Sequence, residues 1–218
     1  MKKFICIIPA LEKNNYSRSG DLIDWGNTSL IEWKISQALK VNNLEKIVVT
    51  TPSKKIAKLL RNYNVEILLR KKNLSLGALY KFVGSKFYNK KILWLNPTAP
   101  FLSDKDINEF VKKYIKHKKK FDSGFTSIEL KEYLFDAKKS INFKSSRETI
   151  SRAKLPTFFQ STNGAYIISG DHMKKFGTLY GKKFYNHKVS WLQSLEVKTS
   201  TELESFRFFI SKYFKENI

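Results

Sequence analysis

The fold of this 218-residue chain is decided by the stretch IIPALEKNNYSRSG at residues 7–20. The apolar run at residues 3–8 is rich in isoleucine, which predicts a buried strand, and a Pro-Ala pair then opens a long polar loop. In α/β proteins the loop after the first buried strand is a usual place for the phosphates of a nucleotide. Glycine lets a backbone approach phosphates closely, yet residues 11–13 contain none. The stretch therefore predicts a nucleotide-binding architecture with an unusual loop.

Beyond this stretch, strand-like and helix-like patterns alternate along the chain. Short apolar runs are separated by segments whose apolar residues recur every three or four positions, which is the spacing of one helix face. Such alternation favours an α/β fold with a mainly parallel sheet, flanked by helices and joined by right-handed crossovers. We therefore expect a single domain over residues 1–218. The expected strands are 3–8, 46–51, 65–69, 91–95, 123–128, 164–169 and 195–197, and the expected helices are 29–40, 53–63, 77–87, 104–118 and 200–215.

The alternation is interrupted at residues 129–160, which are polar and lack a clear helical period. A strand pattern resumes only at Gly164. We interpret the interruption as a small inserted arm or hairpin that leaves the sheet and returns to it.

The composition limits the functional classes. The net charge is +22, but only six of the 41 basic residues are arginines, whereas surfaces that read nucleic-acid bases usually favour arginine. We therefore expect the positive field to attract an anionic substrate or to serve solubility, rather than to bind nucleic acid. No apolar run approaches the roughly 20 residues of a membrane span. Cys6 is the single cysteine and lies in a strand pattern, so it predicts a core side chain in a cytoplasmic protein without an internal disulfide.

Several segments, in order and at suitable separations, resemble the acylneuraminate cytidylyltransferase family, which includes the CMP-sialic acid synthetases. IIPA (7–10) is similar to the first strand and turn of that family, and TSLIEW (28–33) resembles its "GKPLIEY" helix start. The other matches are IVVTTPSKKIAKLLRNYNVEILLR (47–70) to "VVVSTDSEEIAEIAKKYGAEVPFLR", LNPTAPFLSDKDI (95–107) to "LQPTSPLRTAEDI", LPTFFQSTNGAYII (155–168) to "LPxxYxxNGAIYI" and SLEVKTSTELE (194–204) to "SIDIDTPEDLE". The resemblance spans nearly the whole chain and implies a Rossmann-like nucleotidyltransferase fold.

The resemblance also implies a reaction. The anomeric hydroxyl of an acidic nine-carbon sugar, of the sialic, legionaminic or pseudaminic acid type, attacks the α-phosphate of CTP and releases pyrophosphate. Such chemistry depends on positioning and on neutralising phosphate charge, with Mg²⁺ held by carboxylates. In the family the stretch after the fifth strand reaches a second subunit, which implies a homodimer with Tyr133, Leu134 and Phe135 as contacts. The alternative is an arm that lies on the surface without a partner.

Residue by residue, the resemblance assigns two groups of binding side chains. The nucleotide-binding group is Pro9, Ala10, Leu11 and Arg70, and the group around the acidic sugar is Asn96, Arg152 and Asn163. Arg152 suits a bidentate grip on the sugar carboxylate. Each assignment has a simpler alternative, because Pro-Ala can be a plain strand exit, Asn-Pro and Asn-Gly are ordinary turn pairs, and an arginine beside two lysines can be a solvated charge.

The chain departs from the family pattern in its first loop and at its metal position. The family loop, approximately "RGGSKGIPRKN", covers residues 11–21 without gaps and matches almost nowhere, so Lys13 and Arg18 are the candidate catalytic cations there. The two aspartates that hold the metal in "SIDIDTPEDLE" are replaced by Glu196 and Lys198. Glu196 can bind Mg²⁺ through oxygen. A protonated Lys198 cannot, and it becomes a third candidate cation that neutralises phosphate directly.

Two main hypotheses follow from these departures. The chain is either an active, divergent cytidylyltransferase, or a catalytically inactive homologue that serves as a binding or assembly partner in surface-sugar biosynthesis. A third is a basic module that binds nucleic acid or an anionic polymer. The retained Arg70, Arg152 and NGAYI segment favour the enzyme.

Overall fold

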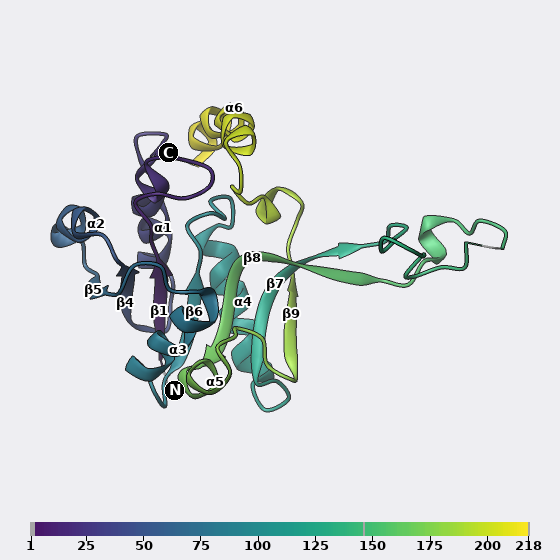
Figure 1. The fold of residues 1–218 in the computed structure, drawn as a ribbon, viewed down its shortest axis with the longest axis horizontal. Helices are drawn as coiled ribbons and strands as arrows, with labels where there is room; N and C mark the ends of the chain where they lie inside the picture. The colour runs from purple at the N-terminus through teal and green to yellow at the C-terminus, as the bar shows by residue number, and fades with distance from the viewer. Residues whose placement is uncertain (1–2, 146, 218) are drawn as a thin grey trace.

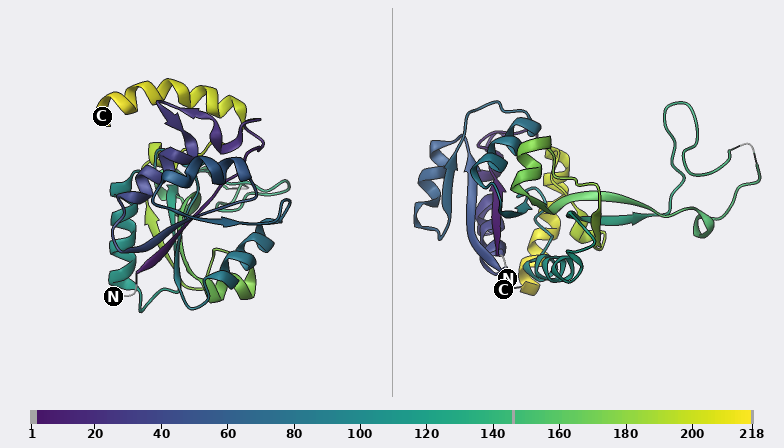
Figure 2. Two further views of the ribbon diagram at one scale, coloured as in Figure 1. Left: turned by 90° about the vertical axis from the view of Figure 1, so that its left-hand side faces the viewer. Right: turned by 90° about the horizontal axis from the view of Figure 1, so that it is seen from below.

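The computed structural model describes residues 3–145 and 147–217, with the backbone alone at positions 207 and 210–217. Seven strands form one sheet in the order β5-β4-β1-β6-β8-β7-β9, with helices on both faces (Figures 1 and 2). The strands are β1 (Phe4–Pro9), β4 (Leu44–Thr51), β5 (Glu66–Leu69), β6 (Lys91–Leu95), β7 (Ser123–Leu130), β8 (Phe158–Ser169) and β9 (Phe184–Lys188), and β2 (Asp24–Trp25) pairs separately with β3 (Thr28–Ser29). The helices are α1 (Leu30–Leu39), α2 (Lys54–Leu59), α3 (Leu76–Lys86), α4 (Asp104–His117), α5 (Gly170–Phe176) and α6 (Ser200–Asn217).

The strand directions place the carboxyl ends of six of the seven strands at one edge of the sheet. β1 is parallel to both β4 and β6, and β5 is parallel to β4. β8 runs antiparallel between β6 and β7, and β9 is parallel to β7. The expected mainly parallel α/β sheet flanked by helices is therefore confirmed, with β8 as the reversed strand.

The sequence of β1 explains its central place. Its residues alternate between two cores: Cys6 and Ile8 pack with α1, α2 and α4, whereas Ile5 and Ile7 pack with α3 and α5. A strand buried on both faces needs a continuous apolar run rather than an alternating one, and FICIIP supplies it. Cys6 is fully buried, as expected of a core side chain.

Serines and one threonine mark where helices begin. A side-chain oxygen at the residue before each helix accepts a backbone N–H three positions later, which satisfies one of the unpaired donors of the first turn. Ser29 and Ser103 do so within full capping boxes, and Thr199 forms such a box with Glu202. The other examples are Ser53, Ser75 and Ser169.

Six expected strands and five expected helices are confirmed, but one strand was predicted wrongly. Residues 195–197 form no strand, because Val197 makes a backbone bond only to Thr98 O (2.8 Å) and buries its side chain against Trp25 and Phe101. The missing edge strand is β9, whose FYNHK sequence pairs with β7. The helix expected over 53–63 is shorter, since α2 gives way to a 3₁₀ turn at Leu60–Asn62. Helix α5 and the β2–β3 hairpin were not anticipated.

The arm extends away from the body of the molecule (Figures 1 and 2). The ends of β7 and β8 form the base of the expected segment 129–160. The described residues between the two strands, 131–145 and 147–157, form the rest of it. This part has a small centre of its own, in which the Phe143 ring lies 5.0 Å from Tyr133 and 5.2 Å from Phe135. Phe135 is nevertheless 62% exposed.

Within the described residues, none of the helices has both the length and the apolar character needed to cross a bilayer.

Candidate functional site

A crevice of about 260 Å³ opens where β1, β5 and β6 end. In open α/β sheets ligands bind in the crevice outside the carboxyl ends of the strands. The lining residues come from the first loop, the ends of these strands, α3, the NG turn of β8 and the segment before α6. They are Pro9, Leu11, Asn14, Tyr16, Asp21, Arg70, Leu76, Leu79, Tyr80, Trp94, Asn96, Pro97, Thr98, Asn163 and Glu196.

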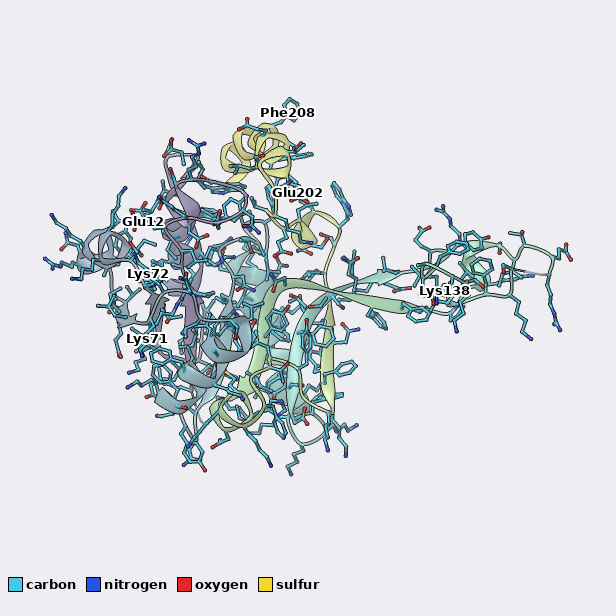
Figure 3. All side chains as sticks on the ribbon, in the orientation of Figure 1. Glu12, Lys71, Lys72, Lys138, Glu202 and Phe208 are labelled. Atoms are coloured by element: carbon cyan, nitrogen blue, oxygen red, sulfur yellow. The ribbon has the colours of Figure 1, made fainter. Side chains whose placement is uncertain are left out.

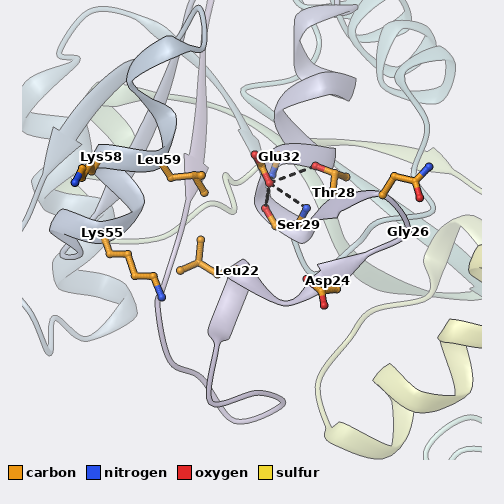
Figure 4. A pocket seen from close by; sticks show the side chains of 10 residues that line it. Leu22, Asp24, Gly26, Thr28, Ser29, Glu32, Lys55, Lys58 and Leu59 are labelled. Carbon is orange, nitrogen blue, oxygen red and sulfur yellow. Dashed lines mark hydrogen bonds between the residues drawn. The ribbon is translucent and has the colours of Figure 1, made fainter.

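A larger depression of about 760 Å³ lies elsewhere, beside the start of α1 (Figure 4). Lys55 and Lys58 of α2 face it, but the carboxylate of Glu32 is already bonded to Thr28 and Ser29. None of the residues assigned from the sequence lines it. We therefore take the smaller crevice as the candidate site, because convergent polar groups matter more than size.

The first loop is closed on itself by a buried carboxylate. Asp21 Oδ2 accepts the backbone N–H of Leu11 at 2.7 Å, Oδ1 accepts the Tyr16 hydroxyl, and the Asp21 N–H donates to Leu11 O at 2.8 Å. Gly20 makes this closure possible, since its φ is +55° and a Cβ there would lie 2.2 Å from Leu11 O. Burial raises the pKa of Asp21 to about 6, although the bonds from Tyr16 and Leu11 and the charge of Arg70 act in the opposite direction. The first N–H of the loop is thus already occupied.

Arg70 brings a positive charge to the crevice. It follows β5, and its backbone N–H bonds to Thr51 O at 3.1 Å. Its guanidinium is half-buried, and its Nε has no hydrogen-bond partner in the described part of the chain. Burial lowers the pKa of Arg70, and the nearby Asp21 opposes that shift. A buried donor without a partner is ready to meet an anionic or carbonyl group of a ligand.

A side-chain network forms the opposite wall. Asn96 Nδ2 donates to Asn163 O at 2.7 Å and to Asn163 Oδ1 at 2.9 Å, while Asn96 Oδ1 accepts Trp94 Nε1 at 2.9 Å. Asn163 Nδ2 donates to Glu196 Oε1. Asn163 has φ of +53°, a left-handed conformation that asparagine tolerates better than most residues. The network holds three polar side chains in fixed orientations beside the crevice.

Helix α1 fixes the loop that follows β6. Lys34 Nζ donates to Ala99 O at 2.8 Å, and Gln37 Nε2 and Trp33 Nε1 both donate to Pro100 O, at 3.1 and 2.9 Å. Lys34 is fully buried, and burial lowers its pKa to about 7. These bonds position the turn that carries Asn96 and Thr98 into the crevice.

The structure brings together most of the residues assigned from the sequence, but not all. Pro9, Leu11, Arg70, Asn96, Asn163 and Glu196 line one crevice. Ala10 is buried beside them, with its N–H bonded to Thr50 O at 2.9 Å, so this N–H is not open to a nucleotide.

The candidate cations lie at or beyond the rim. Lys198 Nζ is 3.2 Å from Glu196 Oε2. Lys13 lines a neighbouring depression with Lys72, and Arg18 is exposed on the first loop. Arg152 is on the arm, 66% exposed and paired with Glu132 at 3.2 Å, and it does not line the crevice of its own chain.

Sequence reasoning missed Asp21, Tyr16 and Tyr80. The aspartate and Tyr16 stand in a polar loop, where no pattern marks either of them as buried. Tyr80 stands on α3, and its ring packs edge-on against Trp94, 5.1 Å between centroids. The one available signal was Gly20, since a glycine at the end of a polar loop often marks a tight backbone approach.

The side chains present do not fit a protein-held Mg²⁺ ion. Among the described residues no group of three His, Cys, Asp or Glu side chains could hold a metal. Glu196 is the expected ligand, but Oε1 already accepts bonds from Asn163 and Thr98, and Oε2 faces the Lys198 ammonium. Mg²⁺ requires near-octahedral oxygen coordination, usually with one or two free carboxylates.

Comparison with known proteins gives one family and a consistent set of folds. Residues 21–202 match the family model described as cytidylyltransferase. An N-acylneuraminate cytidylyltransferase of Escherichia coli O18:K1:H7 (strain RS218 / NMEC) is 30% identical over 118 residues, which are 51% of this chain and 28% of that protein. The match thus spans less than a third of the length of the curated relative.

Two solved structures share the fold at low identity. A CMP:2-keto-3-deoxy-manno-octonic acid synthetase complexed with CTP has a TM-score of 0.73 at 12% identity, over 97% of this chain and 100% of that one. A 4-diphosphocytidyl-2C-methyl-D-erythritol synthase from Anaerococcus prevotii DSM 20548 has a TM-score of 0.67 at 13% identity, over 98% and 99% of the two chains. At such identities the likeness concerns the fold alone.

Proposed function

Because the chain belongs to the cytidylyltransferase family, we propose that it transfers CMP from CTP to an acidic nine-carbon sugar of the sialic, legionaminic or pseudaminic acid type. One observation carries the proposal. The crevice at the carboxyl ends of β1, β5 and β6 is lined by residues from each segment that resembles the family's binding motifs. A free thiol at Cys6 and a nucleotide substrate fit a cytoplasmic enzyme.

The proposed reaction needs positioning and charge neutralisation more than covalent chemistry. A sugar hydroxyl oxygen attacks the α-phosphorus and releases its proton to solvent, the bond from that phosphorus to the oxygen bridging the α- and β-phosphates breaks, and pyrophosphate leaves. Pro9 and Leu11, which line the crevice, contact the cytidine, Ala10 supports them from behind, and the free Nε of Arg70 donates to the nucleotide. Lys13, Arg18 and Lys198 balance the phosphate charge.

On the acceptor side, Asn96 and Asn163 bind the sugar. Their amides are already oriented by each other, by Trp94 and by Glu196, so little side-chain entropy is lost when a ligand binds. Tyr80 lies against Trp94 in the same crevice and offers a hydroxyl on an aromatic surface. Such surfaces can contact both the C–H faces and the hydroxyls of a sugar.

We propose a homodimer in which the arm reaches the partner's crevice. Support comes from the arm's position clear of the body, where Lys138 is labelled in Figure 3, and from exposed apolar side chains on it, including Phe135 and Phe159. In a dimer the arm would bring Arg152 to the acceptor carboxylate of the other subunit. Light scattering at micromolar protein should give twice the monomer mass, and Phe135→Ser should lower it. A monomer mass for the unchanged protein contradicts the dimer.

A catalytically inactive homologue is the second candidate, and the closed loop favours it. The Leu11 N–H, a usual kind of phosphate contact, is already bound to Asp21. A set of side chains that could hold a metal ion for the phosphates is lacking among the described residues. Such a protein would bind or assemble with partners in surface-sugar biosynthesis. It would show neither turnover nor CTP affinity.

Incubation with CTP, Mg²⁺ and a panel of nonulosonic acids separates these candidates. Pyrophosphate release with one of the acids is expected, and Arg70→Ala should reduce the rate at least tenfold. Arg61→Ala is the matched control, because Arg61 is exposed on the 3₁₀ turn after α2. No turnover together with no CTP binding would replace the enzyme by the inactive homologue. Steeply salt-dependent binding to unrelated DNA would favour a basic nucleic-acid module instead.

A further inference from the structure

Glu196 lies at the rim of the crevice in an environment that fixes its carboxylate. The side chain is only 12% exposed. One oxygen accepts bonds from Asn163 Nδ2 and from Thr98 Oγ1, the latter at 3.3 Å. The backbone beside it is held as well, since Val197 N–H donates to Thr98 O at 2.8 Å.

Lys198 is directed toward the same place by the alternation of side chains. Val197 is buried against Trp25 and Phe101, whereas Glu196 and Lys198, on either side of it in the chain, lie together on the side of the crevice rim. The Lys198 Nζ lies 3.2 Å from Glu196 Oε2. Its side chain is 58% exposed, so the ammonium keeps room for a second anionic contact.

Stability does not account for this pair. Because the Lys198 side chain is 58% exposed, the pair contributes about as little as a surface pair, about 0–1 kcal/mol, since solvent screens the ammonium and the long side chain loses freedom. The pair therefore has its main effect on the charge of the crevice.

The charges that line the crevice make a local cation necessary for a phosphate ligand. Asp21 and Glu196 carry negative charge when ionised, and Arg70 is the one basic residue among the residues lining the crevice. The sum over these three residues is about one negative charge, which opposes a phosphate locally although the chain as a whole is strongly positive. Lys198 brings the sum to about zero, and it stands where a divalent ion on Glu196 would have to bind.

We propose that Lys198 is a resident cation, which excludes a protein-held divalent ion from Glu196 and contacts an oxygen of a phosphate ligand directly. The identity of that ligand as a nucleoside triphosphate rests on the proposed function. The exclusion of the metal does not, because it concerns only the geometry of Glu196 and Lys198.

Binding of Mn²⁺ alone, followed by electron paramagnetic resonance, tests the exclusion. The wild type should bind no Mn²⁺ at 1 mM or below. Lys198→Asp should bind one ion, and adding Glu196→Gln should remove it. Lys119→Asp, an equal change of charge at an exposed position in the turn after α4, should behave as the wild type. The proposal is overturned if the wild type binds an ion that Glu196→Gln removes, or if Lys198→Asp binds none.

Titration with CTP tests the phosphate contact. The dissociation constant in EDTA should lie within about twofold of that in Mg²⁺. Lys198→Ala should weaken binding about tenfold in EDTA, and Lys119→Ala should leave it unchanged. Affinity that requires Mg²⁺ and ignores Lys198 refutes the contact. If CTP binds under neither condition, the proposed function fails, while the Mn²⁺ series still decides whether Lys198 excludes the metal.

Discussion

Replacing the buried Lys34 by methionine should change how stability depends on pH. Lys34 is fully buried, and burial lowers its pKa from the usual 10.5 to about 7. Between these values the unfolded chain binds more protons at this residue than the folded one, so stability rises with pH across that window. Below pH 7 the folded protein carries a buried ammonium at full cost, and above pH 10.5 the cost is absent.

The magnitude follows from the same values. Each tenfold change in proton affinity corresponds to about 1.4 kcal/mol, so the drop from 10.5 to about 7 corresponds to about 5 kcal/mol at pH 6. Methionine has similar length but cannot donate to Ala99 O, and a buried carbonyl left unpaired costs about 1–3 kcal/mol. Lys34→Met should therefore stabilise the protein by about 3 kcal/mol at pH 6 and destabilise it by about 2 kcal/mol above pH 10.5.

Urea unfolding of both proteins at pH 6, 8 and 10 measures this crossing. Other titrating groups affect both proteins alike, so the difference between them isolates Lys34. Lys40→Met, at the exposed end of the same helix, is the control and should give no pH-dependent difference. Parallel stability profiles for wild type and Lys34→Met would refute the reasoning, because they would mean that burial does not perturb this ammonium.

Three further substitutions test the crevice and the packing beneath it. Asp21→Asn should stabilise the protein at pH 7 by up to about 3 kcal/mol, because the pKa of Asp21 is raised from 3.8 to about 6. The contribution of Asp21 to stability falls as pH rises through that window, and asparagine does not titrate. Thermal melts at pH 4 and pH 7 should therefore lie closer together for the variant than for the wild type. Asn163→Ala loses the amide network and places alanine at φ of +53°, so calorimetry should show a loss of about 2 kcal/mol, with Asn163→Gly losing less. Gly84→Ala puts a Cβ 2.4 Å from the Lys174 N, and chemical unfolding should show a loss of about 3 kcal/mol, while Gly77→Ala, whose nearest atom is 3.5 Å away, should be tolerated.

The fold was predictable where one local pattern decides the structure. β1 and β6 are apolar on both faces. In a chain that alternates strands with helices, such short continuous apolar runs predict buried strands of a parallel sheet. The sequence FYNHK of β9 carries no such pattern, because its place is set by pairing with β7. Residues 195–197 have a strand-like pattern, but the burial of Val197 beneath α6 holds them outside the sheet.

The site was predictable to the extent that its residues follow strands. Pro9 ends β1, and Arg70 and Asn96 directly follow β5 and β6. Parallel strands bring such positions to one edge of the sheet. Asp21 could not be found in this way, since its burial depends on how a polar loop folds back over the strand end. The position of Arg152 also depends on tertiary structure, because a residue on an arm reaches a crevice only if a second chain supplies one.

Two buried polar groups in the crevice lower the stability of the fold, which favours a role for the crevice in binding a ligand. Asp21 is buried with its pKa raised, and Arg70 keeps a buried Nε without a partner in the described residues. Replacing buried charges by apolar side chains often stabilises a protein, so a domain kept only for its shape would gain from losing both. Perturbed ionisable groups gathered in one cleft are typical of functional sites, where stability is given up for binding or catalysis. The buried charges of Asp21 and Arg70 therefore favour a crevice that binds a ligand.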